Sequence, residues 1–295
     1  MKFTSTCSAA LLSAVLFTSQ GVSAYCSEEK TIRHELPSGD FNEIRLNALA
    51  GDLILEGTEG DVIRIEGLAC TDRTTYLDRM DIRVEADNKA LELSAIIPYH
   101  ESDWHADYAY IDITLEVPKA MLLLVKDSSG DLEGYGVRLE QLIDSSGDIR
   151  LRETSGNLSL RDSAGYVRIN DHRGNLELED SSGDLEVENL GGDLTIVRDS
   201  SGDIEVETVS GFVTVERDSS GDIDIETVRS DVNIGSDGSG SITIRDVKGS
   251  VEIGSDGSGD ISVQRIAGNF ILHRKGSGDI RTAHVEGNVS IPEYR

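Results

Sequence analysis

One motif recurs along most of this chain and limits what the chain can fold into. Its glycines are 17 to 19 residues apart, and a second set of turn residues falls between them. A short, fixed period of this kind is typical of a solenoid, in which each repeat stacks on the one before it. The motif is Asp-Ser-Ser-Gly-Asp followed by an aliphatic residue, with complete copies at 127–132, 144–149, 180–185, 199–204 and 218–223 and looser copies at 162–167, 236–242, 255–261 and 274–280.

The apolar residues between the turns alternate with polar ones. Leu, Ile or Val stands two and four residues after almost every turn residue, as at Ile204 and Val206 or Val213 and Val215. This period of two predicts short strands with one buried face. Two such strands in every 18–19 residues predict an all-β, single-stranded parallel β-helix, or β-solenoid. Counting the pattern from residue 52 gives about twelve coils, and we expect them to be right-handed.

The first 24 residues have the features of a secretory signal peptide. Lys2 precedes an apolar run at 9–17, and Val22-Ser23-Ala24 supplies the small residues that a signal peptidase recognises. We therefore expect cleavage after Ala24 and a mature protein in the periplasm or outside the cell. No later stretch reaches the length of a transmembrane helix, so no membrane insertion is expected.

The remaining chain divides into two predicted parts. Residues 25–51 are expected to form a lead-in strand and cap, and residues 52–295 the β-solenoid. Insertions at 68–80 and 98–109 interrupt the repeat, each after the second strand of its coil. In later coils the acidic motif occupies that corner. We therefore expect both insertions to lie on the acidic edge and to contact each other.

The charge balance excludes some partners, and the cysteines suggest a crosslink. The formal net charge is −28, which disfavours binding to nucleic acid and to anionic membrane surfaces. Beyond the signal peptide only Cys26 and Cys70 remain, an even pair in an oxidising compartment. We predict a disulfide between them; the alternative is two free buried thiols.

The repeated aspartates are the first candidate site. One precedes and one follows the turn glycine, so stacking predicts two rows of carboxylates along one edge. Bound Ca²⁺ would relieve their repulsion through oxygen ligands. The pattern is similar to the calcium-binding nonapeptide repeats of secreted toxins and proteases, but it lacks their paired glycines. The alternative is a solvated turn in which each Asp bonds its own backbone. The candidate ligands are Asp180, Asp184, Asp199, Asp203, Asp218 and Asp222.

The insertion at 98–109 is the second candidate site, because it holds the only Trp and several Tyr and His residues. An aromatic patch that contacts a sugar or a protein is one interpretation. A transition-metal site built from the two His and nearby carboxylates is another, although the spacing matches no known metal motif. In the third, Trp104 packs down and caps the solenoid. The candidate binding residues are Tyr99, His100, Asp103, Trp104, His105 and Tyr108.

No catalytic residue is predicted. The acids repeat evenly instead of forming one singular site, and no Ser-His-Asp order, Cys/His pair or phosphate-binding loop is present. A carbohydrate-active enzyme, either a polysaccharide lyase or a hydrolase, stays open as an alternative, because clustered carboxylates on a β-helix could supply an acid/base pair.

The D-S-S-G-D-[IL]-x-[VI] repeat behind a signal peptide, together with the run at 108–136, resembles a bacterial family of β-strand-repeat proteins of unknown function that are often labelled adhesin-like. The resemblance covers roughly residues 40–295. It implies an exported β-helix with no catalytic residues to carry over. We therefore predict a non-catalytic binding or scaffold module at the cell envelope, whose partner is a protein or a polysaccharide. No cofactor is expected, and a calcium-stabilised β-roll is the further alternative.

Overall fold

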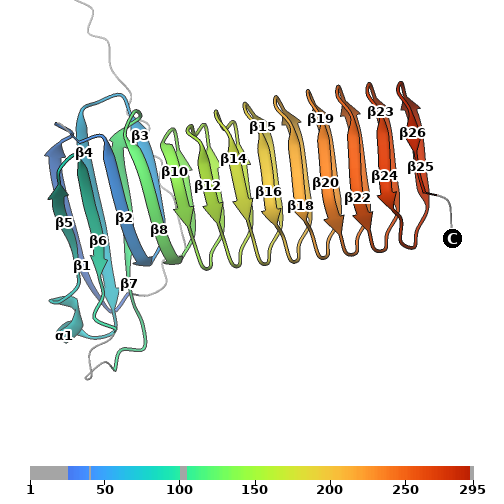
Figure 1. The fold of residues 1–295 in the computed structure, drawn as a ribbon. Helices are drawn as coiled ribbons and strands as arrows, with labels where there is room; N and C mark the ends of the chain where they lie inside the picture. The colour runs from blue at the N-terminus through green and yellow to red at the C-terminus, as the bar shows by residue number, and fades with distance from the viewer. Residues whose placement is uncertain (1–25, 40, 100–104, 293–295) are drawn as a thin grey trace, which may run out of the picture.

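The chain folds into a long stack of β-strands arranged in two facing sheets (Figure 1). The computed structural model describes residues 26–39, 41–99 and 105–292. The predicted signal peptide at 1–24 therefore lies outside the described residues, and no helix within those ranges is long and apolar enough to cross a membrane. Each sheet has 13 strands.

The regular part of the stack begins at β8. From there the strands alternate between the two sheets, and each pairs in parallel with the equivalent strands of the neighbouring coils. The first sheet holds β9 (Leu132–Tyr135), β11 (Ile149–Arg152), β13 (Val167–Asn170), β15 (Leu185–Leu190), β17 (Ile204–Val209), β19 (Ile223–Val228), β21 (Ile242–Val247), β23 (Ile261–Ile266) and β25 (Ile280–Val285). The second holds β8 (Leu122–Ser129), β10 (Arg138–Ile143), β12 (Leu158–Arg161), β14 (Leu176–Glu179), β16 (Leu194–Arg198), β18 (Val213–Arg217), β20 (Val232–Asp237), β22 (Val251–Asp256), β24 (Phe270–Arg274) and β26 (Val289–Ser290).

The core lies between the two sheets and is built from the alternating aliphatic residues. Ile204 and Val206 are each 1% exposed, and Ile223 and Ile225 repeat them on the next coil. Each such side chain contributes about 1.5–3 kcal/mol by leaving water. The predicted all-β parallel solenoid is confirmed. The expected twelve coils are too many, because the stack has about nine successive turns.

The overcount comes from the N-terminal end, where strands do not stack in chain order. Its elements are β1 (Glu28–Pro37), β2 (Glu43–Ala50), β3 (Leu53–Thr58), β4 (Val62–Thr71), α1 (Thr74–Leu77), β5 (Asp81–Asp87), β6 (Ala90–Ile96) and β7 (Ala109–Pro118). The coil β2–β3 lies between the coil β6–β7 and the coil β8–β9. Strands β4, β5 and β1 then pair in antiparallel fashion and finish this end.

This end corrects two further expectations. Residues 43–50 are not a separate lead-in, because β2 pairs with β8 inside the second sheet. Residues 68–71 are not part of an inserted loop, because they are the last residues of β4. Alternation of apolar residues shows which face of a strand is buried. It does not show which strand lies beside it.

Each coil turns at two corners. The acidic corner leads from the second sheet into the first, carries the Asp-Ser-Ser-Gly-Asp motif, and forms the lower edge in Figure 1. Both insertions lie at this edge, as predicted, and they touch: the Asp107 N–H donates a hydrogen bond to Asp72 (3.2 Å), and the His105 N–H donates one to the Tyr76 hydroxyl (2.8 Å). The second corner returns the chain to the second sheet.

Candidate functional site

The first aspartate of each acidic corner is buried, contrary to the expected solvated turn. Asp199 is fully buried, and Asp180 and Asp218 on the adjacent coils are 1% and 2% exposed. The looser motifs continue the same row, which the sequence analysis had not extended so far. The row, here named the aspartate ladder, consists of Asp127, Asp144, Asp162, Asp180, Asp199, Asp218, Asp237 and Asp256.

Each ladder aspartate starts its own turn. The following backbone N–H donates to the Oδ1 atom of Asp144, Asp162 and Asp180, each at 2.7 Å. The Oδ2 atoms of these three residues have no hydrogen-bond partner among the described residues. The same holds for both carboxyl oxygens of five other members, namely Asp127, Asp199, Asp218, Asp237 and Asp256. Unpartnered buried carboxylates are costly, so the ladder requires compensation.

Burial changes the acidity of the ladder. Burial first, and then the charge of neighbouring aspartates, raises the pKa of Asp127 and Asp199 to about 7. The pKa of Asp237 also rises to about 7, first through burial and then through Asp218 and Asp256 on either side. Asp144 and Asp180 rise to about 6 for the same main reason. These carboxyl groups can therefore hold protons near neutral pH.

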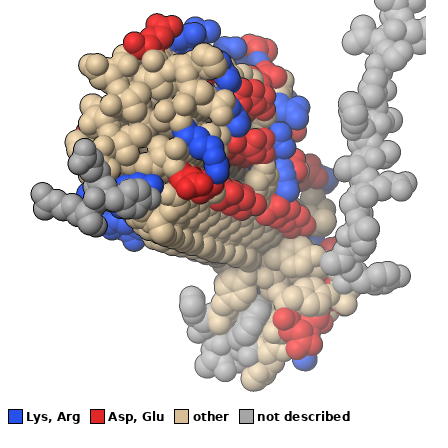
Figure 2. Space-filling model, turned by 90° about the vertical axis from the view of Figure 1, so that its right-hand side faces the viewer, with Lys and Arg blue, Asp and Glu red and all other residues tan. Residues whose placement is uncertain are grey.

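The aspartate after each turn glycine has a different role. The Oδ1 atom of Asp184 accepts a hydrogen bond from the backbone N–H of Asp203 (3.0 Å), and Asp203 accepts one from Asp222 (2.8 Å). Each of these exposed carboxylates thus ties its coil to the next one. Figure 2, turned toward the C-terminal end of the stack, shows a row of acidic side chains beside an uncharged ridge along the lower edge.

The six candidate calcium ligands therefore belong to two different environments. Asp180, Asp199 and Asp218 are inside the corner, whereas Asp184, Asp203 and Asp222 are outside it and bonded to backbone. Within the described ranges no group of three or more His, Cys, Asp or Glu residues is arranged to hold a metal ion. Calcium binding stays a prediction.

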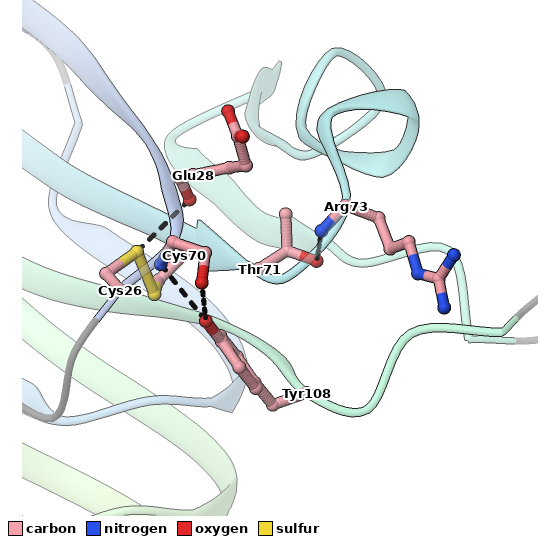
Figure 3. The surroundings of a disulfide bond; sticks show 7 residues. Cys26, Glu28, Cys70, Thr71, Arg73 and Tyr108 are labelled. Carbon is pink, nitrogen blue, oxygen red and sulfur yellow. Dashed lines mark hydrogen bonds between the residues drawn. A yellow bond between two sulfur atoms is a disulfide. The ribbon is translucent and has the colours of Figure 1, made fainter.

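The predicted cysteine pair is joined: Cys26 and Cys70 form a disulfide, with their Cα atoms 5.7 Å apart (Figure 3). It links the residues before β1 to the end of β4. Beside it, the hydroxyl of Tyr108 donates to the Ser27 hydroxyl and accepts a hydrogen bond from the Ser27 N–H, both at 3.1 Å. One residue of the second insertion is thus used to fasten the N-terminal end.

The other described residues of the 98–109 insertion also hold structure in place. Tyr99 packs against the core, and its hydroxyl donates to the carbonyl of Ala109 (2.8 Å). The backbone of His105 is bound by Tyr76 of α1, over whose ring the Arg79 guanidinium lies at 5.0 Å. The candidate residues His100, Asp103 and Trp104 lie outside the described residues. Their proposed binding role stays a prediction.

His172, which the sequence analysis did not single out, is a core residue. His172, at the second corner, is 1% exposed and lies between the Thr154 hydroxyl and the Gly156 carbonyl, at 2.9 Å from each. Its Nε2–H donates to the carbonyl, so Nδ1 accepts from the threonine. Burial lowers the pKa of His172. The neutral ring is fully bonded and has no free nitrogen for catalysis.

The outer face of the first sheet carries a hollow that the sequence analysis missed. It lies over β3, β9, β11 and β13, has a volume of about 710 Å³, and has Leu55, Gly134 and Leu151 in its floor. The remaining residues that line it are mostly polar or aromatic and are here named the arginine–tyrosine face: Ile54, Glu56, Glu133, Tyr135, Arg150, Arg152, Tyr166, Arg168 and Asn170.

Some side chains of this face form ion pairs and hydrogen bonds with other residues, and others do not. Arg150 pairs with Asp148 (2.7 Å), and Arg168 pairs with Glu186 (2.9 Å), which also accepts a hydrogen bond from the Tyr166 hydroxyl. The exposed Arg152 makes no ion pair within the described residues. Tyr135 is 48% exposed and Ile54 39% exposed, both unusually high for large apolar or aromatic side chains. These groups are available to a partner.

Only the stacking register brings this face together. Arg150 and Arg168 occupy the same outward position on adjacent strands, and Tyr135 stands beside Arg152 and Glu56. The sequence does show part of this face, because arginines occupy the outward positions 150, 152 and 168 of two successive coils. The contribution of β3 could not be found, because β3 precedes β9 by nearly 80 residues in the chain.

Among known protein families, a family model described as Toastrack DUF4097 matches residues 13–208 and 112–246. No curated protein matches the chain. Among solved structures, a putative adhesin from Bacteroides fragilis NCTC 9343 is 18% identical, with 86% of this chain and 97% of that chain covered and a TM-score of 0.38. A putative cell adhesion protein from Clostridium sporogenes ATCC 15579 is 10% identical, with 87% and 99% covered and a TM-score of 0.33.

A third solved structure, a putative lipid binding protein from Parabacteroides distasonis ATCC 8503, is 15% identical. The match covers 90% of this chain and 98% of that one, with a TM-score of 0.32. Likeness at these identities and TM-scores does not extend to function.

Proposed function

The chain belongs to the Toastrack DUF4097 family of β-repeat proteins, and we propose that it acts as a non-catalytic binding module at the cell envelope, with the arginine–tyrosine face as its contact surface. One observation carries the proposal: the stack brings Tyr135, Arg152 and Ile54 together, exposed, around a hollow of about 710 Å³. Tyr and Arg, like Trp, are enriched at the hot spots of protein interfaces.

The partner that fits this face best is a polysaccharide. The hollow is shallow and mostly polar at its rim, and it follows the outer face of a sheet, so it suits an extended chain better than a small apolar ligand. The exposed ring of Tyr135 offers an apolar surface for a sugar ring. Arg152, Asn170 and Glu133 offer donors and acceptors for hydroxyl groups. Equivalent positions recur at about 4.8 Å along the axis, so an extended polymer would meet a new pair of outward side chains on each coil.

The expected location supports this role. The predicted signal peptide would export the chain. The Cys26–Cys70 disulfide is the kind of crosslink that persists in oxidising compartments. A net charge of −28 keeps an exported repeat protein soluble, and it disfavours anionic polymers other than those that engage the arginines locally.

A carbohydrate-active enzyme is the second candidate, because one specific pair favours it. Glu56 and Glu133 line the same hollow, on strands that pair with each other. Two carboxyl groups that flank a bound sugar are what glycoside hydrolysis requires. The binding module and the enzyme would use the same surface, but only the enzyme would cleave the polysaccharide.

Binding to a panel of neutral and uronic-acid-containing polysaccharides separates these candidates. We expect Tyr135→Ala and Arg152→Ala to weaken binding at least tenfold, a loss of about 1.4 kcal/mol or more. Phe212→Ala and Arg217→Ala, which truncate exposed residues of the same types away from the hollow, are the matched controls and should bind as the wild type does.

Three outcomes would contradict the proposal. Shortening of the polysaccharide that stops in Glu56→Gln or Glu133→Gln would make the protein an enzyme. Binding lost in Trp104→Ala but kept in Tyr135→Ala would move the contact surface to the 98–109 insertion. Equal binding by all variants and controls would exclude the arginine–tyrosine face.

A further inference from the structure

The aspartate ladder is a continuous row of carboxyl groups inside the acidic corner. Adjacent members occupy equivalent positions on hydrogen-bonded coils, as in the bridge between Asp199 and Asp218 and the pairing of Asp237 with Asp256. Equivalent positions on paired strands are about 4.8 Å apart. All eight members are at most 5% exposed, and each has at least one carboxyl oxygen without a partner.

The surroundings of the ladder contain little positive charge. At its N-terminal end, Leu49 pairs with Asp127. At its C-terminal end, the charge of Lys275 acts on Asp256. From the first sheet, the carboxylates that act on the ladder are Asp52, Asp148 and Asp203, all of the same sign. The basic residues directly before ladder members, Lys126, Arg161, Arg198 and Arg217, are exposed, and within the described residues none forms an ion pair with a ladder carboxylate. Protons or other cations must therefore balance the eight carboxylates.

The contacts between ladder members favour protons. Asp237 lies between Asp218 and Asp256 on successive coils and interacts with the carboxyl groups of both, and two carboxyl oxygens attract only when a proton lies between them. A divalent cation would need several oxygens from at least three groups around one point. The described residues form no such group.

We propose that the aspartate ladder is a proton-binding site, in which a protonated carboxyl group donates its O–H to the carboxylate of the next coil. The shared protons join neighbouring coils at the acidic corner. When they leave, like charges face each other at each step of the ladder and the corner loosens.

The sign of the pH effect follows from the direction of the shifts. Folding raises the pKa of Asp127, Asp199 and Asp237 from 3.8 to about 7, so the folded chain binds more protons than the unfolded chain between these values. The stability that the ladder provides is complete below about pH 4 and is lost as the pH rises through 6 to 7. Acid therefore increases the contribution of the ladder to the stability of the fold.

The test compares melting temperatures at pH 5 and pH 8 for the wild type, Asp199→Asn and Asp184→Asn. Asparagine keeps the shape of the side chain and can hydrogen-bond along a ladder without a charge. We expect Asp199→Asn to melt several degrees above the wild type at pH 8 and close to it at pH 5. Asp184→Asn removes the same charge from the exposed row that follows the turn glycines, so it controls for the effect of net charge and should follow the wild-type pH dependence.

Two results would overturn the proposal. One is an Asp199→Asn variant that is destabilised equally at both pH values. The other is a rise in wild-type melting temperature with Ca²⁺ at pH 8 that chelator reverses and Asp199→Asn abolishes, which would make the ladder a metal site. If the variant does not fold, infrared spectroscopy of the wild type at pH 6 decides: the carbonyl band of protonated carboxyl groups should be present in the folded protein and vanish on unfolding. Its absence from the folded protein contradicts the proposal.

Discussion

The two corners of each coil turn the chain with different residues. Both turn the chain between the same two sheets, and both bury one side chain on each coil. At the acidic corner that side chain is a carboxyl group such as Asp199, and at the second corner it is an aliphatic group such as Val209. Their backbones differ as well. The acidic corner uses glycine at positive φ, 129° at Gly202, whereas the second corner uses ordinary residues, such as Thr208 at 59°.

Close backbone approach between coils occurs at both corners. At Gly202 an added Cβ would lie 1.9 Å from the carbonyl oxygen of Gly183 on the adjacent coil, and at Gly174, in the second corner, it would lie 1.9 Å from that of Gly156. The second corner differs in that a side chain is retained at a positive-φ position, as at Thr208. Both corners are therefore limited by contact between coils, and the second corner also carries the strain of a side chain at positive φ.

The largest effect should come from breaking the close approach. Gly202→Ala should lower the free energy of unfolding by about 2–4 kcal/mol, because the new methyl group meets backbone that cannot move aside and because φ is unfavourable for alanine. Gly60→Ala is the matched control, since the nearest atom to its Cβ would be 4.0 Å away. Chemical denaturation of both variants measures the effect. Equal stability of the two would refute the close contact between coils.

A smaller effect of opposite sign should appear at the second corner. Thr227 is exposed and has a φ of 61°, which is unfavourable for a β-branched residue, while Asn189 occupies the equivalent position at 57°. Thr227→Asn should therefore raise the free energy of unfolding by about 1 kcal/mol. The same substitution at Thr243, inside β21, should be neutral or destabilising, because Asn is disfavoured in strands. A loss of stability at position 227 would mean that its backbone is not strained.

The comparison also shows what the sequence could reveal. Alternation of aliphatic residues predicted the strands and their buried face, as at Ile204 and Val206. The burial of Asp199 was not predictable, because an Asp at the start of a turn has the same sequence signature whether it faces solvent or the interior. Its depth depends on how far the turn folds back over it.

The candidate site was less predictable than the fold. Tyr135, Arg152 and Ile54 come together only because the coil β2–β3 stacks directly on β8–β9, across more than 60 intervening residues. The antiparallel strands that finish the N-terminal end take up those residues. Local pattern contains no information on such an exchange of stacking order. The Cys26–Cys70 pair was an exception, since only two cysteines remained to be paired.

The most direct test of the account is a pH titration of the aspartate carboxyl carbons by carbon-13 NMR. The account holds that the aspartates before and after the turn glycines differ in charge state, because the first row lies inside the corner and the second outside it. Burial raises the pKa of Asp199 to about 7, and the N–H of Asp279, followed by Arg281, lowers the pKa of Asp260. We predict a midpoint near 7 for Asp199 and a midpoint below 3.8 for Asp260. Joint titration of both groups in the ordinary range of an exposed aspartate, near 3.8, would contradict the account.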